Sequence, residues 1–170
     1  MKQRVRAILV TPDGTTLLMK RVRPGRDPYR VVVGGGVEDT DADHEAALLR
    51  EIREEIAGEA EIVRPFHQLE NASGETEHFY LARVRTWNFA DRSGPEFQRD
   101  DRGEYLLEEV PLTTEALAGL NLLPEEISVA LCRALDRGDL LAPAQPRSYA
   151  PPLEGTGVLR DGPFSRSGGA

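Results

Sequence analysis

The sequence predicts a mixed α+β domain in which helices pack on the faces of a curved mixed sheet. Short apolar runs separated by turn signals predict strands through the first half of the chain and again near residue 80. An acidic helical segment follows three consecutive glycines, and a second helical segment comes late in the chain. The order of these elements shows no regular βαβ alternation, which argues against a purely parallel sheet.

Three strands are expected before the first helix. Residues 5–10 and 15–22 are separated by Thr-Pro-Asp-Gly, a strong turn signal, so they should form a hairpin. Residues 23–28 are expected to be a loop, and residues 29–33 a short strand that leads into the glycines.

The rest of the domain is predicted to hold four more strands and two helices. These are strands at 60–63, 66–69, 78–85 and 105–110, and helices at 113–120 and 124–137. Pro124 suits a first helical position and Gly138 suits the position after the last turn. Residues 87–103 are polar, contain Gly and Pro, and are too long for a simple hairpin, so a functional or mobile loop is expected.

Length and composition predict one domain with a C-terminal tail. A chain of 170 residues with 39% apolar residues can bury a core without disulfides. From about residue 142 the composition changes to Pro, Gly and Ser, which cannot form a core of their own. We therefore expect a domain over residues 1–141 and a tail over residues 142–170.

Charge and cysteine content exclude several classes of protein. The net charge of −8 argues against binding to duplex nucleic acid, which needs a basic surface. Cys132 is the only cysteine, so no internal disulfide can form and a reducing cytoplasm fits. The basic start is not followed by a long apolar run, so neither a signal peptide nor a membrane span is expected.

The acidic helix carries the first candidate site. Glu51, Glu54 and Glu55 stand at i, i+3 and i+4, so their carboxylates converge on one side of the helix. Each like-charged pair at this spacing destabilises a helix by about 0.2–0.5 kcal/mol, and Arg50 can relieve part of this by pairing with Glu54. Three convergent carboxylates are a reasonable site for a divalent cation such as Mg²⁺, which prefers oxygen ligands.

The glycines at 34–36 supply the second half of that site. Without Cβ atoms the backbone can turn sharply and bring its own polar groups up to a ligand. The helix is entered through Asp39, Asp41 and Asp43, all good N-cap residues. Taken alone, a charged helix is more often a solvated face and a glycine run is more often a loop. Together, a glycine turn and a carboxylate-lined helix suit phosphate chemistry, because a bound metal neutralises the phosphate.

The order and spacing of these residues resemble a known motif. Residues 35–58 are similar to the Nudix box, G-x5-E-x7-R-E-U-x-E-E-x-G-U, where U is a bulky apolar residue, and residues 50–55 match R-E-U-x-E-E at every position. Two departures occur. The first Glu of the box falls on Asp41 counted from the glycines and on Ala42 counted from Arg50, which indicates a loop one residue longer with Asp41 as the expected stand-in. The last Gly position holds Ala57, and Gly58 follows.

The resemblance implies a fold and an activity. The fold would be an α/β/α sandwich over roughly residues 1–140. The activity would be hydrolysis of a phosphoanhydride bond in a nucleoside diphosphate linked to another moiety, with Mg²⁺ as cofactor and Mn²⁺ as an alternative. The expected partner is a small nucleotide-type molecule, and a homodimer is left open.

The resemblance also implies roles for individual residues. The expected metal ligands are the three helix carboxylates and one glycine carbonyl: Glu51, Glu54, Glu55, and Gly34 or Gly35. Arg50 would orient the glutamates through salt bridges. Within the helix, Glu54 is the first choice for taking the proton from water.

Several residues outside the helix are further candidates. Glu96, on the long loop, is a second candidate catalytic acid, with Asp100, Asp101 and Glu104 as competitors. Arg21 and Arg23 could bind substrate phosphates, although strand arginines are more often solvated. Glu38 could bind water in the outer shell of the metal or simply end the strand.

Two other functions compete with hydrolysis. A non-catalytic module that binds nucleotide-like ligands on the same fold usually lacks box glutamates, and all three are present here. A prenyl diphosphate isomerase would need a reactive cysteine near the site, and Cys132 on a late helix fits poorly.

Overall fold

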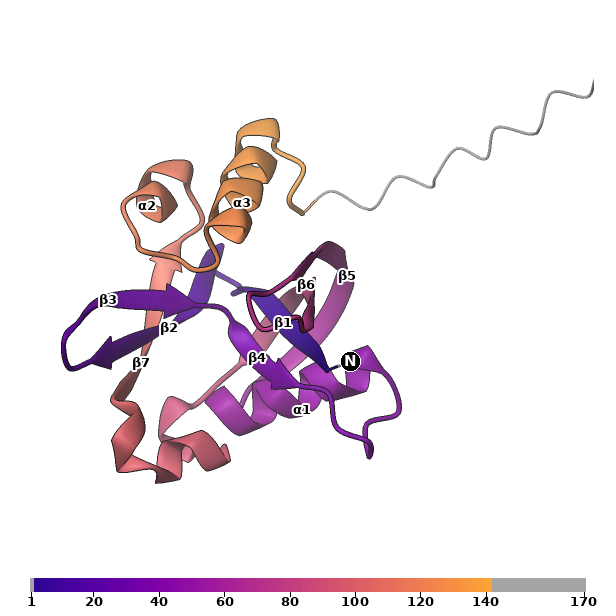
Figure 1. Ribbon diagram of the computed structural model, residues 1–170. Helices are drawn as coiled ribbons and strands as arrows, with labels where there is room; N and C mark the ends of the chain where they lie inside the picture. The colour runs from indigo at the N-terminus through magenta and orange to yellow at the C-terminus, as the bar shows by residue number, and fades with distance from the viewer. Residues whose placement is uncertain (1, 142–170) are drawn as a thin grey trace, which may run out of the picture.

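The computed structural model describes residues 2–141 and contains one mixed sheet with helices on both faces (Figure 1). The strands are β1 (Gln3–Val10), β2 (Thr15–Arg23), β3 (Arg26–Val31), β4 (Val33–Gly36), β5 (Glu59–Glu70), β6 (Thr76–Thr86) and β7 (Glu104–Pro111). The helices are α1 (His44–Ile56), α2 (Thr114–Ala118) and α3 (Glu125–Arg137). Three short 3₁₀ turns lie between β6 and β7, at Phe89–Asp91, Pro95–Gln98 and Asp100–Arg102.

The sheet opens in its middle, between β1 and β2. These two strands are paired only at Val10 and Thr16. Away from this single pair, the edge of β1 that faces β2 pairs with β4, and the edge of β2 that faces β1 pairs with β3. On their other edges β1 runs parallel to β6 and β2 runs antiparallel to β7. The result is a wedge-shaped opening with β1 and β4 on one side and β2, β3 and β7 on the other.

Side chains alternate across β1 and build two cores. Val5, Ala7 and Leu9 belong to the core under α1, whereas Ile8 and Val10 belong to the core under α2 and α3. Figure 1 shows α1 on one side of the sheet and α2 and α3 on the other. The predicted α/β/α sandwich with a mixed sheet is therefore confirmed.

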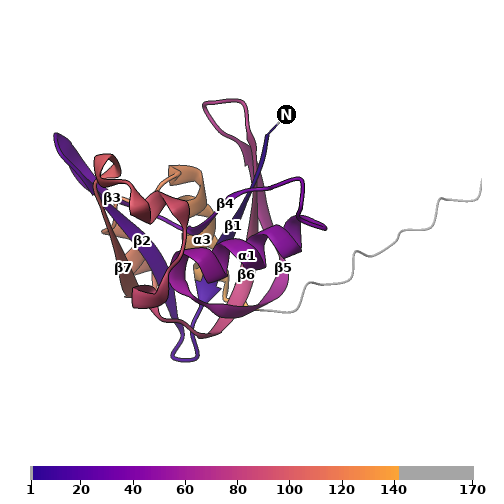
Figure 2. The same cartoon turned by 90° about the horizontal axis from the view of Figure 1, so that it is seen from below.

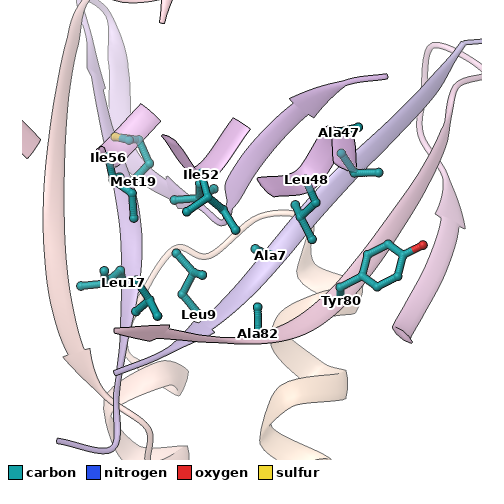
Figure 3. Packing of buried hydrophobic residues seen from close by; sticks show 13 residues of the cluster. Ala7, Leu9, Leu17, Met19, Ala47, Leu48, Ile52, Ile56, Tyr80 and Ala82 are labelled. Carbon is teal, nitrogen blue, oxygen red and sulfur yellow. The ribbon is translucent and has the colours of Figure 1, made fainter. Parts of the chain in front are cut away.

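Helix α1 is held to the sheet by its apolar face. Ala47, Leu48, Ile52 and Ile56 are fully buried, and Figure 3 shows them facing the side chains of β1, β2 and β6. Burial of each large aliphatic side chain contributes about 1.5–3 kcal/mol. This packing fixes the rotation of α1, so the flank of the helix next to its apolar face, which carries Glu51 and Glu55, lies at the wedge.

The two ends of α1 explain the departures in the motif. Among the predicted N-cap residues, Asp43 caps the helix and accepts a hydrogen bond from the Ala46 amide at 2.7 Å. Ala57 ends the helix in the left-handed conformation (φ 47°, ψ 42°), where glycine is usual. Gly58 is also constrained, because a Cβ there would lie 2.8 Å from Ile52 Cγ2.

Three predictions about the strands were wrong. Residues 23–28 do not form a loop, since Gly25 (φ 72°) reverses the chain within a tight turn and β3 begins at Arg26. Glycines 34–36 do not form a turn, because they pair with β1 as strand β4. Residues 60–63 and 66–69 belong to one strand, β5, whose register shifts on both sides of Pro65 let it accommodate a residue without an amide proton.

The remaining strands and helices lie where they were predicted, but the hairpin expected of residues 5–10 and 15–22 is reduced to the single pair Val10–Thr16. The helix at 124–137 is confirmed, and the helix at 113–120 is shorter than expected. The predicted tail, residues 142–170, lies outside the described residues. None of the helices within residues 2–141 is long and apolar enough to cross a membrane.

The role of the glycine strand leads to a test of stability. Gly34 has φ 139°, and a Cβ there would collide with the Val5 carbonyl, whereas a Cβ at Gly36 would meet nothing within 4 Å. Gly34→Ala should therefore lower the free energy of unfolding by at least about 2 kcal/mol, and Gly36→Ala by about 1 kcal/mol or less. Chemical denaturation measures both, and equal losses would contradict the assignment of strain to Gly34.

Candidate active site

The backbone of β4 lies directly against the carboxylates of α1. A Cβ added to Gly35 would lie 2.5 Å from Glu51 Oε1, so any side chain at this position would displace the carboxylate. The Gly34 amide donates a hydrogen bond to Glu55 Oε2 at 2.8 Å. Helix and strand thus meet without intervening side chains, and the polar groups of both share one small volume.

Arg50 joins the loop before α1 to the helix. It donates to both carboxylate oxygens of Asp41, at 3.0 and 2.9 Å, and to the Gly36 carbonyl at 2.9 Å. Its Nη1 also donates to Glu51 at 3.0 Å and to Glu54 at 3.2 Å. This network holds the Arg50 guanidinium beside Glu51 and Glu54, and its orienting role stays a prediction.

The longer loop is closed by Asp41 rather than by a glutamate. Hydrogen bonds from Arg50 lower the pKa of Asp41 below its usual value. The Glu38 amide also donates to Asp41 Oδ2, at 2.8 Å. The Glu38 carboxylate is mostly exposed and lies 3.8 Å from Arg50 Nη1, at the outer edge of the loop. Asp41 therefore lies where it can support Arg50, as expected for the stand-in of the first box glutamate. Glu38 lies at the outer edge of the loop.

Two of the helix glutamates are electrostatically strained. Burial raises the pKa of Glu51, although Arg50 opposes this effect. Burial also raises the pKa of Glu55 to about 8, against the Gly34 hydrogen bond and the charge of Arg6, and nearby Glu51 and Glu96 add to the rise. A divalent cation would supply the positive charge that this arrangement lacks.

These carboxylates form the floor of a cleft of about 380 Å³ in the wedge of the sheet. One wall comes from β1 and β4, and the other from β2, β3, β7 and the last 3₁₀ turn. The floor carries three acids, Glu51, Glu55 and Glu96. The walls carry four arginines and two tyrosines: Arg4, Arg6, Arg21, Arg102, Tyr29 and Tyr105. Acids below arginines are a suitable arrangement for a metal ion below a phosphate chain.

Of the two predicted phosphate-binding arginines, only Arg21 lies in the cleft. Its guanidinium stacks 3.6 Å from the centre of the Tyr105 ring and donates to the Arg102 carbonyl at 2.9 Å. Its buried Nε has no hydrogen-bond partner among the described residues, and burial lowers the pKa of Arg21. Arg23 is exposed at the end of β2 and packs against Gly103, outside the cleft. Its placement does not support the phosphate role expected for it.

The long loop brings Glu96 to the cleft. The amides of Ser93 and Gly94 donate to the Glu54 carbonyl at 2.8 and 3.0 Å, which ties the loop to the end of α1. Phe97 packs edge-on against Tyr105, with 4.9 Å between ring centres. Figure 2 shows the short turns of this loop beside α1. The loop is therefore anchored at two points on either side of Glu96.

The competing acids of the loop lie elsewhere. Asp101 pairs with Arg99 at the surface, and Glu104 is exposed at the start of β7. Neither lines the cleft, and the side chain of the third competitor, Asp100, lies outside what the structure describes. Among the described acids of the loop, Glu96 is the one beside Glu51 and Glu55.

Glu54 stands apart from the other two helix glutamates. Its side chain is one-third exposed, pairs with Arg50 and does not line the cleft. Within residues 2–141, no three His, Cys, Asp or Glu side chains are already arranged around one point as a metal site. Binding by all three helix glutamates would require Glu54 to turn away from Arg50. The carboxylates of Glu51 and Glu55 beside the Gly35 backbone still provide the all-oxygen donor set that suits Mg²⁺.

Four residues around the cleft were not predicted from the sequence: Arg4, Arg6, Arg102 and Tyr105. Arg4 and Arg6 interrupt an aliphatic strand at alternate positions, and side chains two apart share one face of a strand. That alternation was the signal available for them. No comparable signal marks Arg102 or Tyr105, since their approach to Arg21 depends on the pairing of β7 with β2.

A second hollow, of about 520 Å³, meets the cleft at Arg6, which lines both. It lies on the face covered by α3, close to the start of that helix. Its apolar wall includes Val31, Val32, Phe79 and Leu123. Four carboxylates also line it, against the single arginine: Glu70, Glu77, Glu125 and Glu126. The two adjoining hollows therefore differ in charge, one rich in arginine and the other in carboxylate.

The raised pKa of Glu55 gives a pH-dependent test. The folded-state pKa of about 8 lies above the ordinary 4.5, so the metal-free folded chain holds this proton more tightly than the unfolded chain does. Stability of the metal-free protein should therefore fall as pH rises from about 5 to about 8, by about 1.4 kcal/mol per unit of pKa shift. Glu55→Gln should flatten this dependence and raise the melting temperature at pH 8, with Glu45→Gln, an exposed acid on the same helix, as control. Thermal melts from pH 5 to 9 measure this. If the melting temperature of Glu55→Gln depends on pH in the same way as that of the wild type, the prediction is contradicted.

Comparisons of sequence and fold with known proteins identify relatives of this chain. The sequence model of the NUDIX domain family matches residues 1–131. The fold is similar to the E. coli ORF135 protein, with 26% identity, a TM-score of 0.57, and coverage of 85% of this chain and 95% of that chain. It is also similar to the MutT NUDIX hydrolase from Burkholderia pseudomallei, with 25% identity, a TM-score of 0.51, and coverage of 76% and 95%.

A third solved structure supports the fold alone. An ADP-ribose pyrophosphatase from Streptococcus suis is 22% identical, with a TM-score of 0.55 and coverage of 80% of this chain and 92% of that chain. No curated protein matches the chain. The family match over most of the sequence, together with the Arg50 network and the glycine strand, shows that this chain belongs to the Nudix hydrolase family.

Proposed function

We propose that this chain is a Mg²⁺-dependent hydrolase that breaks a phosphoanhydride bond in a nucleoside diphosphate linked to another moiety. The observation that carries the proposal is the direct contact of the Gly35 backbone with the Glu51 carboxylate, in a cleft that also holds Glu55 and Glu96. Buried acids with raised pKa values beneath a set of arginines are typical of a metal and phosphate site.

The metal would be held by Glu51, Glu55 and the Gly34 carbonyl, with Glu54 as a further ligand. Of the two glycine carbonyls expected as ligands, that of Gly35 is directed to β1, where Gly35 pairs with Val5, whereas Gly34 faces Glu55. A bound Mg²⁺, or Mn²⁺ in its place, neutralises charge on the phosphates and lowers the pKa of bound water. Arg50 keeps Glu51 in place through its hydrogen bond at 3.0 Å. The chain's own part is thus to fix carboxylates in a small and largely dehydrated space.

The arginines of the cleft would bind the phosphate chain. Arg21 is the best prepared, because Tyr105 and the Arg102 carbonyl already hold its guanidinium. Arg4 faces it from β1, and its buried Nε also has no hydrogen-bond partner within the described part of the chain. Phosphate oxygens bound at these guanidinium groups would cancel part of the clustered positive charge of the cleft.

Two acids are candidates for taking the proton from the attacking water. Glu96 lines the cleft directly, on a loop that is anchored on both sides. Glu54 is held by Arg50 at 3.2 Å and would need to turn toward the cleft. The positions therefore favour Glu96 as the acid nearer to the reacting atoms, with Glu54 as the alternative.

The charges of the two hollows suggest how the substrate lies. The phosphate chain fits the cleft with its arginines, and the remaining moiety fits the adjoining hollow, whose carboxylates would repel further phosphates. This arrangement favours a small nucleotide-type substrate over a nucleic acid duplex. A domain that ends near residue 141 and a cytoplasmic location remain predictions from the sequence, which leaves a homodimer open.

The first activity test removes the helix acids one at a time. Wild-type protein is assayed with Mg²⁺ on a panel of nucleoside triphosphates, nucleotide sugars, dinucleoside polyphosphates and ADP-ribose, with products identified by phosphorus NMR. On the substrate found, Glu54→Gln and Glu55→Gln should each lower turnover by about 10²–10⁴. Glu45→Gln should leave turnover unchanged. Near-normal turnover in both variants, or no hydrolysis of any member of the panel by the wild type, would refute the proposal.

The second activity test concerns the loop acid. If Glu96 acts mainly in the transition state, Glu96→Gln should lower kcat by at least about tenfold with little change in KM. Asp101→Gln, on the same loop but outside the cleft, should change neither constant. A Glu96→Gln variant with unchanged kcat would assign the proton transfer to the helix glutamates.

A further inference from the structure

An arginine in the middle of the sheet connects the two hollows. Arg6 lies on β1 and is paired with Gly34 of β4 on one edge and with Phe79 of β6 on the other. Its side chain is 18% exposed, and burial of a charged group at this level requires partners. The contacts that hold Arg6 should therefore affect both the cleft and the second hollow, both of which this residue lines.

Both sides of the Arg6 guanidinium are fixed. Nε donates to Glu77 Oε2 at 3.1 Å, and Nη1 donates to the Gly34 carbonyl at 2.5 Å. The other oxygen of Glu77 accepts a hydrogen bond from Asn71 Nδ2 at 2.9 Å. Glu77 and Asn71, which line the second hollow, thus fix one side of Arg6. On the side of the cleft, Arg6 in turn fixes the Gly34 carbonyl of β4.

Gly34 carries this contact on to the helix acids. Its carbonyl accepts from Arg6, and its amide donates to Glu55 at 2.8 Å. The residue has φ 139°, a conformation that only glycine adopts readily, so its backbone gains no rigidity from a side chain. The hydrogen bond from Arg6 fixes the orientation of the Gly34 carbonyl, the proposed metal ligand, and a carbonyl oxygen has a second lone pair for the metal.

From this geometry we infer that Arg6 is a positioning residue for the metal site, acting directly on the Gly34 carbonyl and, through the Gly34 amide, on Glu55. This inference rests on the proposed function, since it concerns the same metal. Groups that orient the ligands of a metal are worth about 10- to 100-fold in metal affinity or activity when removed. The chain Asn71–Glu77–Arg6–Gly34–Glu55 also gives the second hollow a direct polar connection to the metal site.

The test measures metal affinity without substrate, which separates a positioning role from direct contact with substrate. Mn²⁺ is titrated into metal-free wild type and Arg6→Met, and free Mn²⁺ is followed by electron paramagnetic resonance. Arg6→Met should weaken Mn²⁺ binding by about 10- to 100-fold. At saturating Mn²⁺ it should lower kcat more than it raises KM.

Arg64→Met is the matched control. Arg64 is also partly buried on a strand and donates to a backbone carbonyl, that of Leu140 at 3.0 Å, but it lines neither hollow. Its loss should lower thermal stability and leave Mn²⁺ affinity within twofold of the wild type. If buried arginines acted only by stabilising the fold, Arg6→Met and Arg64→Met would change Mn²⁺ affinity to the same extent.

Glu77→Gln provides a second route if Arg6→Met does not fold. Glutamine offers one acceptor oxygen to the two donors Arg6 and Asn71, so Mn²⁺ affinity should fall in the same direction by a smaller factor. Folded Arg6→Met with wild-type Mn²⁺ affinity would overturn the inference, as would unchanged affinity in Glu77→Gln where Arg6→Met is unfolded. Absence of Mn²⁺ binding by the wild type would instead count against the proposed function itself.

Discussion

The structure depends on one close approach, that of the β4 backbone to the carboxylates of α1. Gly34 and Gly35 make it geometrically feasible, because a side chain at either position would collide with the Val5 carbonyl or with Glu51. The apolar face of α1 makes it energetically feasible, since the buried residues Leu48 and Ile52 hold the helix against the sheet while the acids meet the strand. The destabilisation of the acids is thus offset by the core beneath them.

Two arginines, Arg50 and Arg6, lie around the contact between β4 and the α1 acids. Arg50 neutralises Asp41 and one edge of the helix acids, and Arg6 faces Glu55 from the opposite side. The net effect still leaves Glu51 and Glu55 with raised pKa values, a condition that a divalent cation would relieve. Functional sites often retain such strain because it is released when the ligand binds. In this molecule the strained groups, the cleft and the motif coincide.

The sequence allowed the helix and its acids to be predicted because both depend on local rules. Helical periodicity placed Glu51, Glu54 and Glu55 together, and the end signals at Pro124 and Gly138 placed α3 within a residue or two. Local rules failed where pairing overrides propensity. Three glycines normally interrupt a strand, yet pairing with β1 makes them β4, and Pro65 is accommodated by shifts of register within β5.

The wall of the cleft was missed for a related reason. Arg6 reaches Gly34 only because β4 crosses the opening of the sheet to lie beside β1, and no local pattern encodes that crossing. The convergence of the helix acids was also overestimated, since Glu54 pairs with Arg50 outside the cleft. Conversely, Glu96 could be singled out from its loop, but its proximity to Glu51 follows from the anchoring of that loop on α1.

The central claim is that the glycine strand and the α1 acids together form a divalent metal site. The most direct measurement is a crystal structure of the chain grown with Mn²⁺, with anomalous diffraction used to locate manganese. We expect an anomalous peak bounded by Glu51, Glu55 and the Gly34 carbonyl. An anomalous map with no peak at this position, or with manganese bound only elsewhere, would contradict the account.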